Sequence, residues 1–464
     1  MIRLLTPGSH QPRALKRREM LRIGGVGLGG LSLPTLLGRP ALGTNAANSF
    51  GKAKSVILFG LFGGVPQHET FDPKPQAPAE IRGDFEAIAS RVSGLHVGSL
   101  MPRVAQLTDK LAVLRAVSTG DNAHSSSGYQ MLTGIPHQPL NRESATAKAP
   151  NLWPSGAAIT RALCDRSGQL PAAVTVPEHI WNDGNFDWPG QDAGFLGKEH
   201  DPWLIPCQPQ EDRIDVPGLQ RGEDMATFRL DARRSLLANM NRSLARLRHD
   251  PAVATLGLHA AKAFDLLCGD GAAAAFDMTQ EKDTVRDRYG RSRFSQSVLL
   301  SRRLIEAGVR LVQINWTRVK GYENQGGWDT HAKHSKSLKE HLMPVMDQTF
   351  SALLEDLDQR GMLEETLVVW LGEFGHTPKF NANAGRDHWG SCFSIAMAGG
   401  GIRGGAVHGA SDAHAAYPVD GLVRPKDIWA TIFHCLGFHA ETEIRDPLGR
   451  PLPISRGRVI EEIL

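Results

Sequence analysis

The chain has 464 residues and a formal net charge of +3, and this length suits either two or three domains or one large α/β domain. The first 43 residues hold seven of the 52 Lys and Arg residues and one of the 49 Asp and Glu residues, so 45 basic and 48 acidic residues remain. Both signs are interspersed along that remainder, which excludes the clustered basic surface that nucleic acid requires. Five widely spaced cysteines without a CxxC pair disfavour a disulfide framework and a thiolate metal site.

The first 43 residues are typical of a twin-arginine export signal. Arg17 and Arg18 precede the apolar segment Ile23–Leu37, and the small residues Ala41–Gly43 follow. The apolar segment is interrupted by glycines and is shorter than the roughly 20 residues that span a bilayer, so we expect no stable membrane anchor. A basic patch ahead of a Gly/Leu-rich helix is the alternative. The order of the segments predicts a periplasmic or secreted protein.

Residues 44–54 are predicted as a short spacer, followed by a single domain over 55–464 with an irregular insertion around 180–290. Nearly continuous apolar runs predict strands that are buried on both faces. These runs are Ser55–Leu61, Leu111–Val117, Ala172–Val176, Val309–Trp316, Thr366–Leu371 and Phe393–Ala398. Helical segments lie between them, and the clearest is His341–Arg360, with one apolar stripe and a terminating Gly361. The alternation predicts an α/β fold with a mainly parallel central sheet.

The insertion contains two segments of different character. Trp181–Pro206 is rich in Asn, Asp, Gly and Trp without a sustained period, and is predicted as a long irregular loop. Its aromatic residues are expected to hold the loop against the protein, with stacking on a sugar as the alternative. Arg221–Tyr289 is predicted to be largely helical.

Four groups of His and carboxylate residues follow predicted strand ends, where α/β sheets bind their ligands. They are GGVPQHETFDP at 63–73, DNAHSSS at 121–127, GGWDTHAKH at 326–334, and GEFGH at 372–376 with GRDHW at 385–389. Each group alone is compatible with ordinary caps and turns. Together they supply the oxygen and nitrogen ligands that divalent metals prefer. A metal would also keep neighbouring carboxylates ionised, and would stabilise the charge that develops in phosphoryl or sulfuryl transfer.

These motifs resemble a known family. The combination FGGVPQHETFDPKP, HSSSGYQMLTG, PGQDAGFLGKEHDPW, GGWDTH, GEFGHTP and GRDHWG is similar to the domain of unknown function numbered 1501, over Ser55 to about Phe438. That family resembles the alkaline phosphatase and sulfatase superfamily. The resemblance implies a three-layer α/β/α sandwich with a site for one or two metals.

The resemblance also suggests a role for the segment HSSSGYQMLTG. It shares its LTG ending with the sulfatase motif CxPSRxxxLTG, and counting back places His124 at the position of the sulfatase cysteine. Because that cysteine is absent, a formylglycine mechanism is excluded. His124 or one of the serines Ser125, Ser126 and Ser127 is left as the candidate nucleophile, or there is none.

The metal ligands are carried over position by position. Glu373 stands in the place of an Asp, and Phe374 replaces the histidine that follows it in relatives. His388 resembles the late ligand histidine, and Glu69 or Asp72 would substitute for the Asp that ends the first strand. The resemblance implies the metal ligands Asp72, Asp329, His331, Glu373 and His388, with Asp387, His376 and Arg386 expected to orient them.

The sequence therefore predicts an exported metal-dependent hydrolase or transferase of phosphate or sulfate esters. The predicted cofactor is a divalent ion, one of Zn, Ca, Mg or Mn, and the substrate would be a small-molecule or polysaccharide ester. The alternative is a non-catalytic binding or scaffold protein that keeps the fold with a degraded site. A redox enzyme is disfavoured because no G-x-G-x-x-G motif follows the first strand.

Overall fold

The computed structural model describes residues 48–464 except 144–147, 166–169, 183–185, 213 and 215–273. The predicted export signal lies outside the described residues, as does the predicted helical stretch from Arg221 to residue 273. Within the described part of the chain, no helix has both the length and the apolar character needed to cross a membrane.

An eight-stranded sheet forms the centre of the fold, in the order β14-β4-β13-β10-β1-β9-β5-β8. Its strands are β1 (Ser55–Gly60), β4 (Leu111–Val117), β5 (Ala173–Val176), β8 (Trp203–Leu204), β9 (Leu311–Asn315), β10 (Thr366–Leu371), β13 (Phe393–Ala398) and β14 (Val407–His408). Only β13 runs antiparallel to its neighbours β10 and β4, and the other pairs in this sheet are parallel. The predicted mainly parallel sheet is confirmed.

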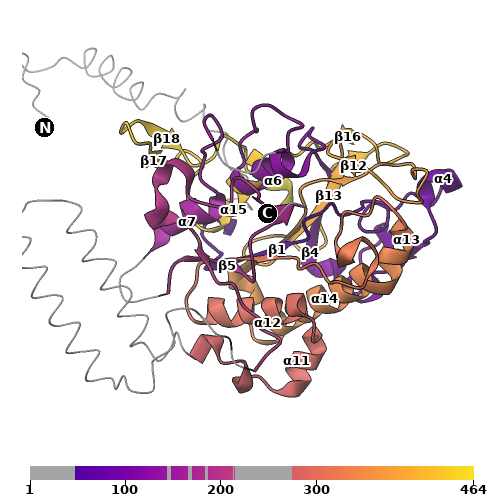
Figure 1. Ribbon diagram of the computed structural model, residues 1–464, viewed down its shortest axis with the longest axis horizontal. Helices are drawn as coiled ribbons and strands as arrows, with labels where there is room; N and C mark the ends of the chain where they lie inside the picture. Colours follow the sequence, from indigo (N-terminus) through magenta and orange to yellow (C-terminus); the bar gives the residue numbers. More distant parts are fainter. Residues whose placement is uncertain (1–47, 144–147, 166–169, 183–185, 213, 215–273) are drawn as a thin grey trace, which may run out of the picture. The chain divides into compact units, whose positions relative to one another are not determined.

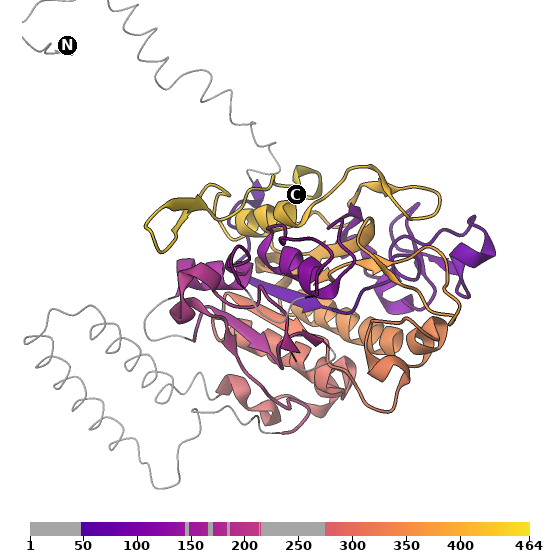
Figure 2. The same cartoon turned by 45° about the horizontal axis from the view of Figure 1, so that its top comes forward.

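Helices cover both faces of this sheet, as Figures 1 and 2 show. One layer contains α11 (Asp283–Tyr289), α12 (Arg293–Glu306) and α14 (Met343–Gln359), and the other contains α6 (His124–Thr133), α7 (Gly156–Cys164) and α15 (Pro425–Cys435). Helix α12 contacts β1 and β9 from one side, and α7 contacts β5 and β9. The α/β/α sandwich is therefore confirmed.

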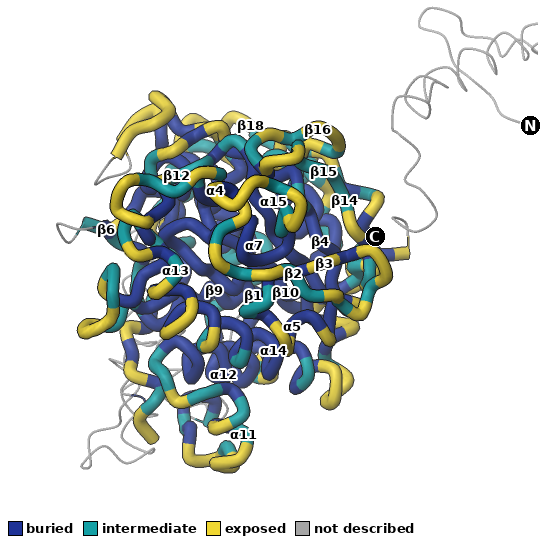
Figure 3. Tube along the Cα trace, turned by 90° about the vertical axis from the view of Figure 1, so that its right-hand side faces the viewer, coloured by how far each residue is buried: buried dark blue, intermediate teal, exposed yellow. Residues whose placement is uncertain are grey.

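The central strand β1 shows why these runs become strands. All six of its residues are buried, and it pairs in parallel with β10 on one side and β9 on the other. Apolar side chains on both faces of such a strand lose contact with water, so a continuous apolar run is favoured over an alternating one. Figure 3 shows the buried strands β1, β9 and β10 at the centre of the trace.

The helix predicted over His341–Arg360 is part of a longer helical stretch. Its α-helical portion is α14, which has Pro344 in its first turn and ends ahead of Gly361, whose φ is +69°. A π-helical turn at Leu338–Leu342 joins it to α13 (His334–Ser337). The sequence pattern missed this N-terminal extension because Leu338 is the one apolar residue between His334 and His341.

Shorter elements complete the described chain. The remaining helices of α type are α4 (Ala79–Arg82) and α5 (Pro102–Ala105), and the two-stranded ribbons are β2 (Ala87–Ala89) with β3 (His96–Gly98), β6 (Trp181–Asn182) with β7 (Phe186–Asp187), β11 (Gly375–His376) with β12 (His388–Trp389), β15 (Ala410–Ser411) with β16 (Pro418–Asp420), and β17 (Glu443–Arg445) with β18 (Pro451–Pro453).

The predicted irregular loop Trp181–Pro206 contributes β8 to the edge of the main sheet. Its aromatic side chains pack within the protein, as expected from the sequence. Phe195 packs edge-on against Trp153, and Trp203 packs edge-on against Phe276. These contacts hold the segment against the protein, together with its short strands β6, β7 and β8.

Candidate metal centre

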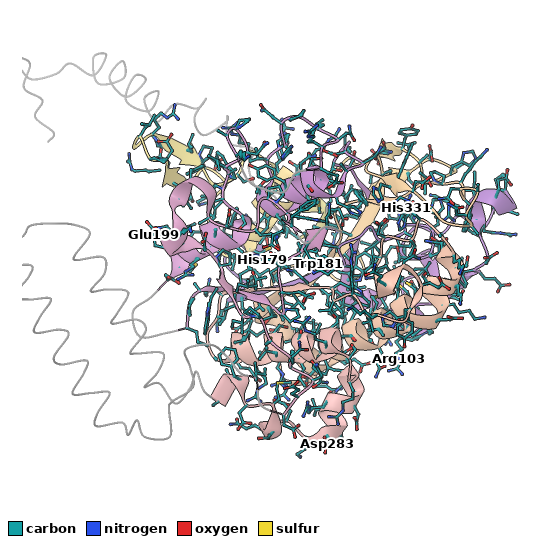
Figure 4. The ribbon with its side chains drawn as sticks, viewed as in Figure 1. Arg103, His179, Trp181, Glu199, Asp283 and His331 are labelled. Atoms are coloured by element: carbon teal, nitrogen blue, oxygen red, sulfur yellow. The ribbon has the colours of Figure 1, made fainter. Side chains whose placement is uncertain are left out.

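Four separate segments bring polar side chains to one rim of the sheet. Glu373 lies two residues beyond β10, and His124 begins α6 after the chain leaves β4. Asp329 and His331 lie in the loop between β9 and α13, and Figure 4 labels His331. His388 lies in β12, just ahead of β13. Because β13 is antiparallel, the chain that enters it lies at the same rim as the chain that leaves β10.

The carboxylate of Asp329 is the centre of this group. Its Oδ1 lies 2.9 Å from His388 Nε2 and 3.0 Å from His331 Nε2, and its Oδ2 lies 3.2 Å from His124 Nε2. The Nε2 atoms of His331 and His388 are 2.9 Å apart. Three imidazoles from three segments therefore turn the same ring nitrogen toward one carboxylate.

Each imidazole is held at its other nitrogen by an oxygen. The Nδ1 contacts are 2.7 Å from His124 to Glu373 Oε1, 2.8 Å from His331 to Asp387 Oδ1, and 2.8 Å from His388 to the Asn122 carbonyl oxygen. These oxygens accept a hydrogen bond, so each Nδ1 carries a proton. Oxygens in this position fix the orientation of a histidine and leave its Nε2 available for a metal.

Glu373 is fully buried and acts on His124 rather than on Asp329. Both of its carboxylate oxygens accept from the backbone N–H of Gly63, at 3.0 and 3.1 Å, and Oε1 also binds His124. Gly63 has a φ of +121°, and a Cβ there would lie 2.8 Å from the backbone nitrogen of Asp329. Glycine is therefore required where the end of β1 passes between Glu373 and Asp329.

When no cation is bound, the His124 and His331 imidazoles each carry a second ring proton at neutral pH. Burial favours neutral His124, but the neighbouring carboxylates of Asp329 and Glu373 outweigh burial and raise its pKa to about 10. The hydrogen bond to Asp329 raises the pKa of His331 to about 9. Burial opposes ionisation of Asp329, yet its three histidine partners hold its pKa well below the usual range. Asp329 is therefore ionised and attracts positive charge.

The residues present fit a divalent metal. One ligand atom each from His124, Asp329 and His388 lie within 4.8 Å of one another. His124 Nε2 is buried and makes no hydrogen bond with the described residues, although Asp329 is 3.2 Å away. Two imidazole nitrogens and a carboxylate oxygen form a donor set that zinc uses in catalytic sites, which keep a further position open.

Two residues proposed for the site make their contacts elsewhere. Asp72 was expected as a metal ligand, but its carboxylate binds Lys74 at 2.9 Å and the Ser411 hydroxyl. Ser125 was a candidate nucleophile, but its hydroxyl is fully buried and donates to Glu143 Oε2 at 2.6 Å. None of these contacts reaches Asp329.

A second group of buried polar side chains lies beside the first. It includes Arg386 and His376, two of the residues expected to orient the metal ligands. Arg386 donates to Glu69 Oε1 at 2.9 Å, and Glu69 lies 3.5 Å from His334 Nε2. His376 pairs with His388 in the β11–β12 ribbon and is fully buried, which lowers its pKa well below the usual value. Arg386 therefore connects the segment carrying His388 to the loop after β1.

His68 in that loop gives a pH-dependent stability that can be measured. Burial lowers its pKa from 6.5 to about 4. Between these two pKa values the unfolded chain binds a proton at His68 and the folded chain does not. The contribution of His68 to the free energy of unfolding is therefore fully present above pH 6.5, and it falls by about 3 kcal/mol as the pH drops to 4. We expect His68→Gln, which can still donate to the His414 carbonyl, to flatten this part of the profile in urea unfolding. The exposed His96 provides the control, His96→Gln. An unchanged pH profile in His68→Gln would contradict the assignment.

The sequence did not indicate Glu143, which binds the start of α6, or Asn182, which binds Glu143. Glu143 accepts from the backbone N–H groups of His124 and Ser125, and Asn182 donates to Glu143. One signal was available. The helix follows Ala123, whose side chain has no oxygen to cap it, so a cap from elsewhere in the chain was needed.

With this geometry in place, the chain can be compared with known proteins. It belongs to the family described as "Protein of unknown function (DUF1501)", which matches residues 53–464. The resemblance stated from the motifs is thereby confirmed. A comparison with curated proteins finds no match.

Several solved structures are similar to this chain at low sequence identity. Ps i-CgsB in complex with k-i-k-neocarrahexaose is 10% identical with a TM-score of 0.40, covering 83% of this chain and 72% of its own. A sulfatase from Pseudoalteromonas sp. is 13% identical with a TM-score of 0.38, covering 92% and 73%. A lipoteichoic acid synthase from Listeria monocytogenes is 9% identical with a TM-score of 0.38, covering 91% and 79%.

Proposed function

We propose that this protein is an exported, metal-dependent hydrolase of phosphate or sulfate esters, with the metal held by His124, Asp329 and His388. The observation that carries the proposal is the convergence of three imidazole Nε2 atoms on the ionised carboxylate of Asp329. A bound divalent ion would polarise an ester oxygen and lower the pKa of water. The export signal predicted from the first 43 residues supports a periplasmic or secreted location in this proposal.

The surrounding residues hold the ligands in the orientation this chemistry requires. Glu373 accepts a hydrogen bond from the Nδ1–H of His124, and the carbonyl of Asn122 accepts one from the Nδ1–H of His388. The ring of His388 also stacks on Phe374, with centroids 4.5 Å apart. Both ligand rings are therefore fixed before a metal or substrate arrives, which reduces the cost of ordering them on binding.

His331 has a different role in this proposal. Its side chain is 44% exposed, whereas that of His124 is 9% exposed, so it can exchange protons with solvent. It holds one proton at Nδ1 toward Asp387 and one at Nε2 toward Asp329. With its pKa raised to about 9, it carries both at neutral pH. We propose that His331 donates its Nε2 proton to the leaving oxygen of the ester. Water is the nucleophile in this proposal, because the Ser125 hydroxyl already donates a hydrogen bond to Glu143.

The test distinguishes a general acid at His331 from a metal ligand at the same position. We expect protein purified from the exported fraction to contain a divalent metal and to hydrolyse aryl phosphate or sulfate esters. His331→Gln should lower kcat by about 10²- to 10⁴-fold, the usual contribution of a general acid, while the metal content stays the same. The control is His179→Gln, because His179 also pairs through Nδ1 with an aspartate, Asp187, outside the cluster.

The outcomes separate the two candidate functions. Loss of metal in His331→Gln would make His331 a ligand and remove the acid assignment. Bound metal without turnover of any ester would favour the binding or scaffold protein.

A further inference from the structure

We infer that Glu143, Asn182 and Trp188 form a clamp that positions His124, so that the irregular segment after β5 is part of the metal centre. This inference rests on the proposed function, because it treats His124 as a metal ligand. The three clamp residues come from two stretches of chain, one following α6 and one following β5 (Ala173–Val176). Within the described residues, none of the three makes a hydrogen bond or ion pair with Asp329, so they act through His124.

The first contact fixes the backbone of His124. Glu143 Oε1 accepts from the backbone N–H of His124 at 2.7 Å, and Oε2 accepts from the Ser125 N–H at 3.2 Å and the Ser125 hydroxyl at 2.6 Å. The first N–H groups of a helix have no partner within it, and a carboxylate there also interacts favourably with the helix dipole. Because Ala123 offers no capping oxygen, Glu143 supplies the cap from outside the helix.

The second contact fixes the ring of His124. The indole of Trp188 stacks on the imidazole, with centroids 5.4 Å apart and planes 30° from parallel. Trp188 is 4% exposed and lies directly on α6, since a Cβ added at Gly128 would be 2.3 Å from Trp188 Cε3. Glycine at that helical position is therefore needed for the indole to approach the helix. The face of His124 is covered by a side chain that cannot move independently of α6.

Asn182 joins the two contacts. Its Nδ2 donates to Glu143 Oε2 at 2.6 Å, and its Oδ1 accepts from Trp188 Nε1 at 2.5 Å. The amide is 92% buried, and each of its two polar atoms is used. A ring of contacts therefore runs from the His124 backbone through Glu143, Asn182 and Trp188 back to the His124 imidazole. A change at Asn182 disturbs both restraints at once.

The clamp complements Glu373, which holds the Nδ1 edge of the same ring. His124 is thereby restrained at its backbone, at one ring edge and on one ring face, with only Nε2 left to bind a metal. Residues that orient a metal ligand in this way change metal affinity by about 10- to 100-fold when they are removed. The clamp is therefore expected to set how tightly the centre holds its ion.

Cobalt provides a direct test, because bound Co²⁺ reports both its affinity and its ligand geometry through its visible absorption spectrum. We expect Asn182→Ala to weaken Co²⁺ binding by about 10- to 100-fold and to alter the spectrum. Trp188→Phe keeps an aromatic ring on His124 but loses the indole N–H, and should give a smaller shift in the same direction. The matched control is Trp203→Phe in β8, which removes an indole N–H from a tryptophan that packs on Phe276 instead.

The outcomes distinguish the clamp from the metal centre itself. Wild-type affinity and spectrum in both Asn182→Ala and Trp188→Phe would overturn the clamp and leave the proposed function standing. Failure of the wild-type protein to bind Co²⁺ would overturn the proposed function, and the clamp with it. If Asn182→Ala does not fold, as shown by its thermal unfolding, Trp188→Phe against Trp203→Phe decides the question. An equal effect of these two tryptophan variants would also overturn the clamp.

Discussion

We expect Asp329→Asn to abolish the proposed metal binding and to lower kcat/KM by more than about 100-fold. That value is the upper end of the loss found when only an outer partner of a ligand is removed. The neutral amide gives up the one negative charge on which His124, His331 and His388 converge. Without that charge the remaining donors are imidazoles, which hold a divalent ion less well at neutral pH because protons compete for them. Metal analysis of the dialysed variant, together with ester turnover, measures the effect.

The control for this experiment is Asp72→Asn. The sequence predicted both aspartates as ligands, whereas the structure pairs Asp72 with Lys74 and Ser411. We expect Asp72→Asn to keep its metal and its turnover. Equal loss in both variants would mean that Asp72 contributes to the centre, and full metal content in Asp329→Asn would contradict the geometry described above.

Replacing Arg386 by Met destabilises the protein by about 3–5 kcal/mol, because it leaves the carboxylate of Glu69 buried without its cation. Glu69 is 2% exposed, and burial would raise its pKa if Arg386 and His334 did not hold that pKa well below its usual range. Arg386 also donates to the carbonyl oxygens of Thr377 and Ile81, which would lose a partner. Urea unfolding at neutral pH measures the change in free energy.

Two further variants test the cause of that loss. Arg82→Met removes an arginine from an exposed position and should change stability by less than about 0.5 kcal/mol. The double variant Arg386→Met with Glu69→Leu removes both charges and should recover part of the stability. A loss below about 1 kcal/mol in Arg386→Met alone would show that Glu69 finds another partner or takes up a proton at little cost.

The sheet was predictable because a strand that is buried on both faces has a continuous apolar run in the sequence. Ser55–Gly60 and Thr366–Leu371 are continuous apolar runs, and both became central strands. The apolar run does not show whether a strand is parallel or antiparallel to its neighbours. Phe393–Ala398 is equally apolar, yet it runs antiparallel, and that reversal brings His388 to the rim.

The placement of the site was predictable in part. His124, Asp329, Glu373 and His388 lie together, as expected from their positions after the parallel strands or, for His388, just before β13. Asp72 lies twelve residues beyond the end of β1, and the chain between them turns it toward Lys74. Distance from the strand end does not separate the two aspartates, because Asp329 lies fourteen residues beyond the end of β9 and still reaches the rim. The partners of each carboxylate come from other segments, and the sequence pattern does not show them.

The direction of each side chain could not be predicted. Whether Glu373 faces a metal or holds His124 depends on the backbone N–H of Gly63, which lies 310 positions away in sequence. The cap that Glu143 forms on α6 and the stacking of Trp188 also depend on segments that meet only in the folded protein. Such contacts carry no local pattern, so they became visible only with the structure.

The central claim is that one divalent ion is held by His124, Asp329 and His388. Crystals of the metal-loaded protein, measured at the absorption edge of the ion, test it most directly through the anomalous difference map. We predict one peak at about 2.0–2.2 Å from the Nε2 atoms of His124 and His388 and from a carboxylate oxygen of Asp329. A map without a peak there, or with the ion bound at other side chains, would contradict the account.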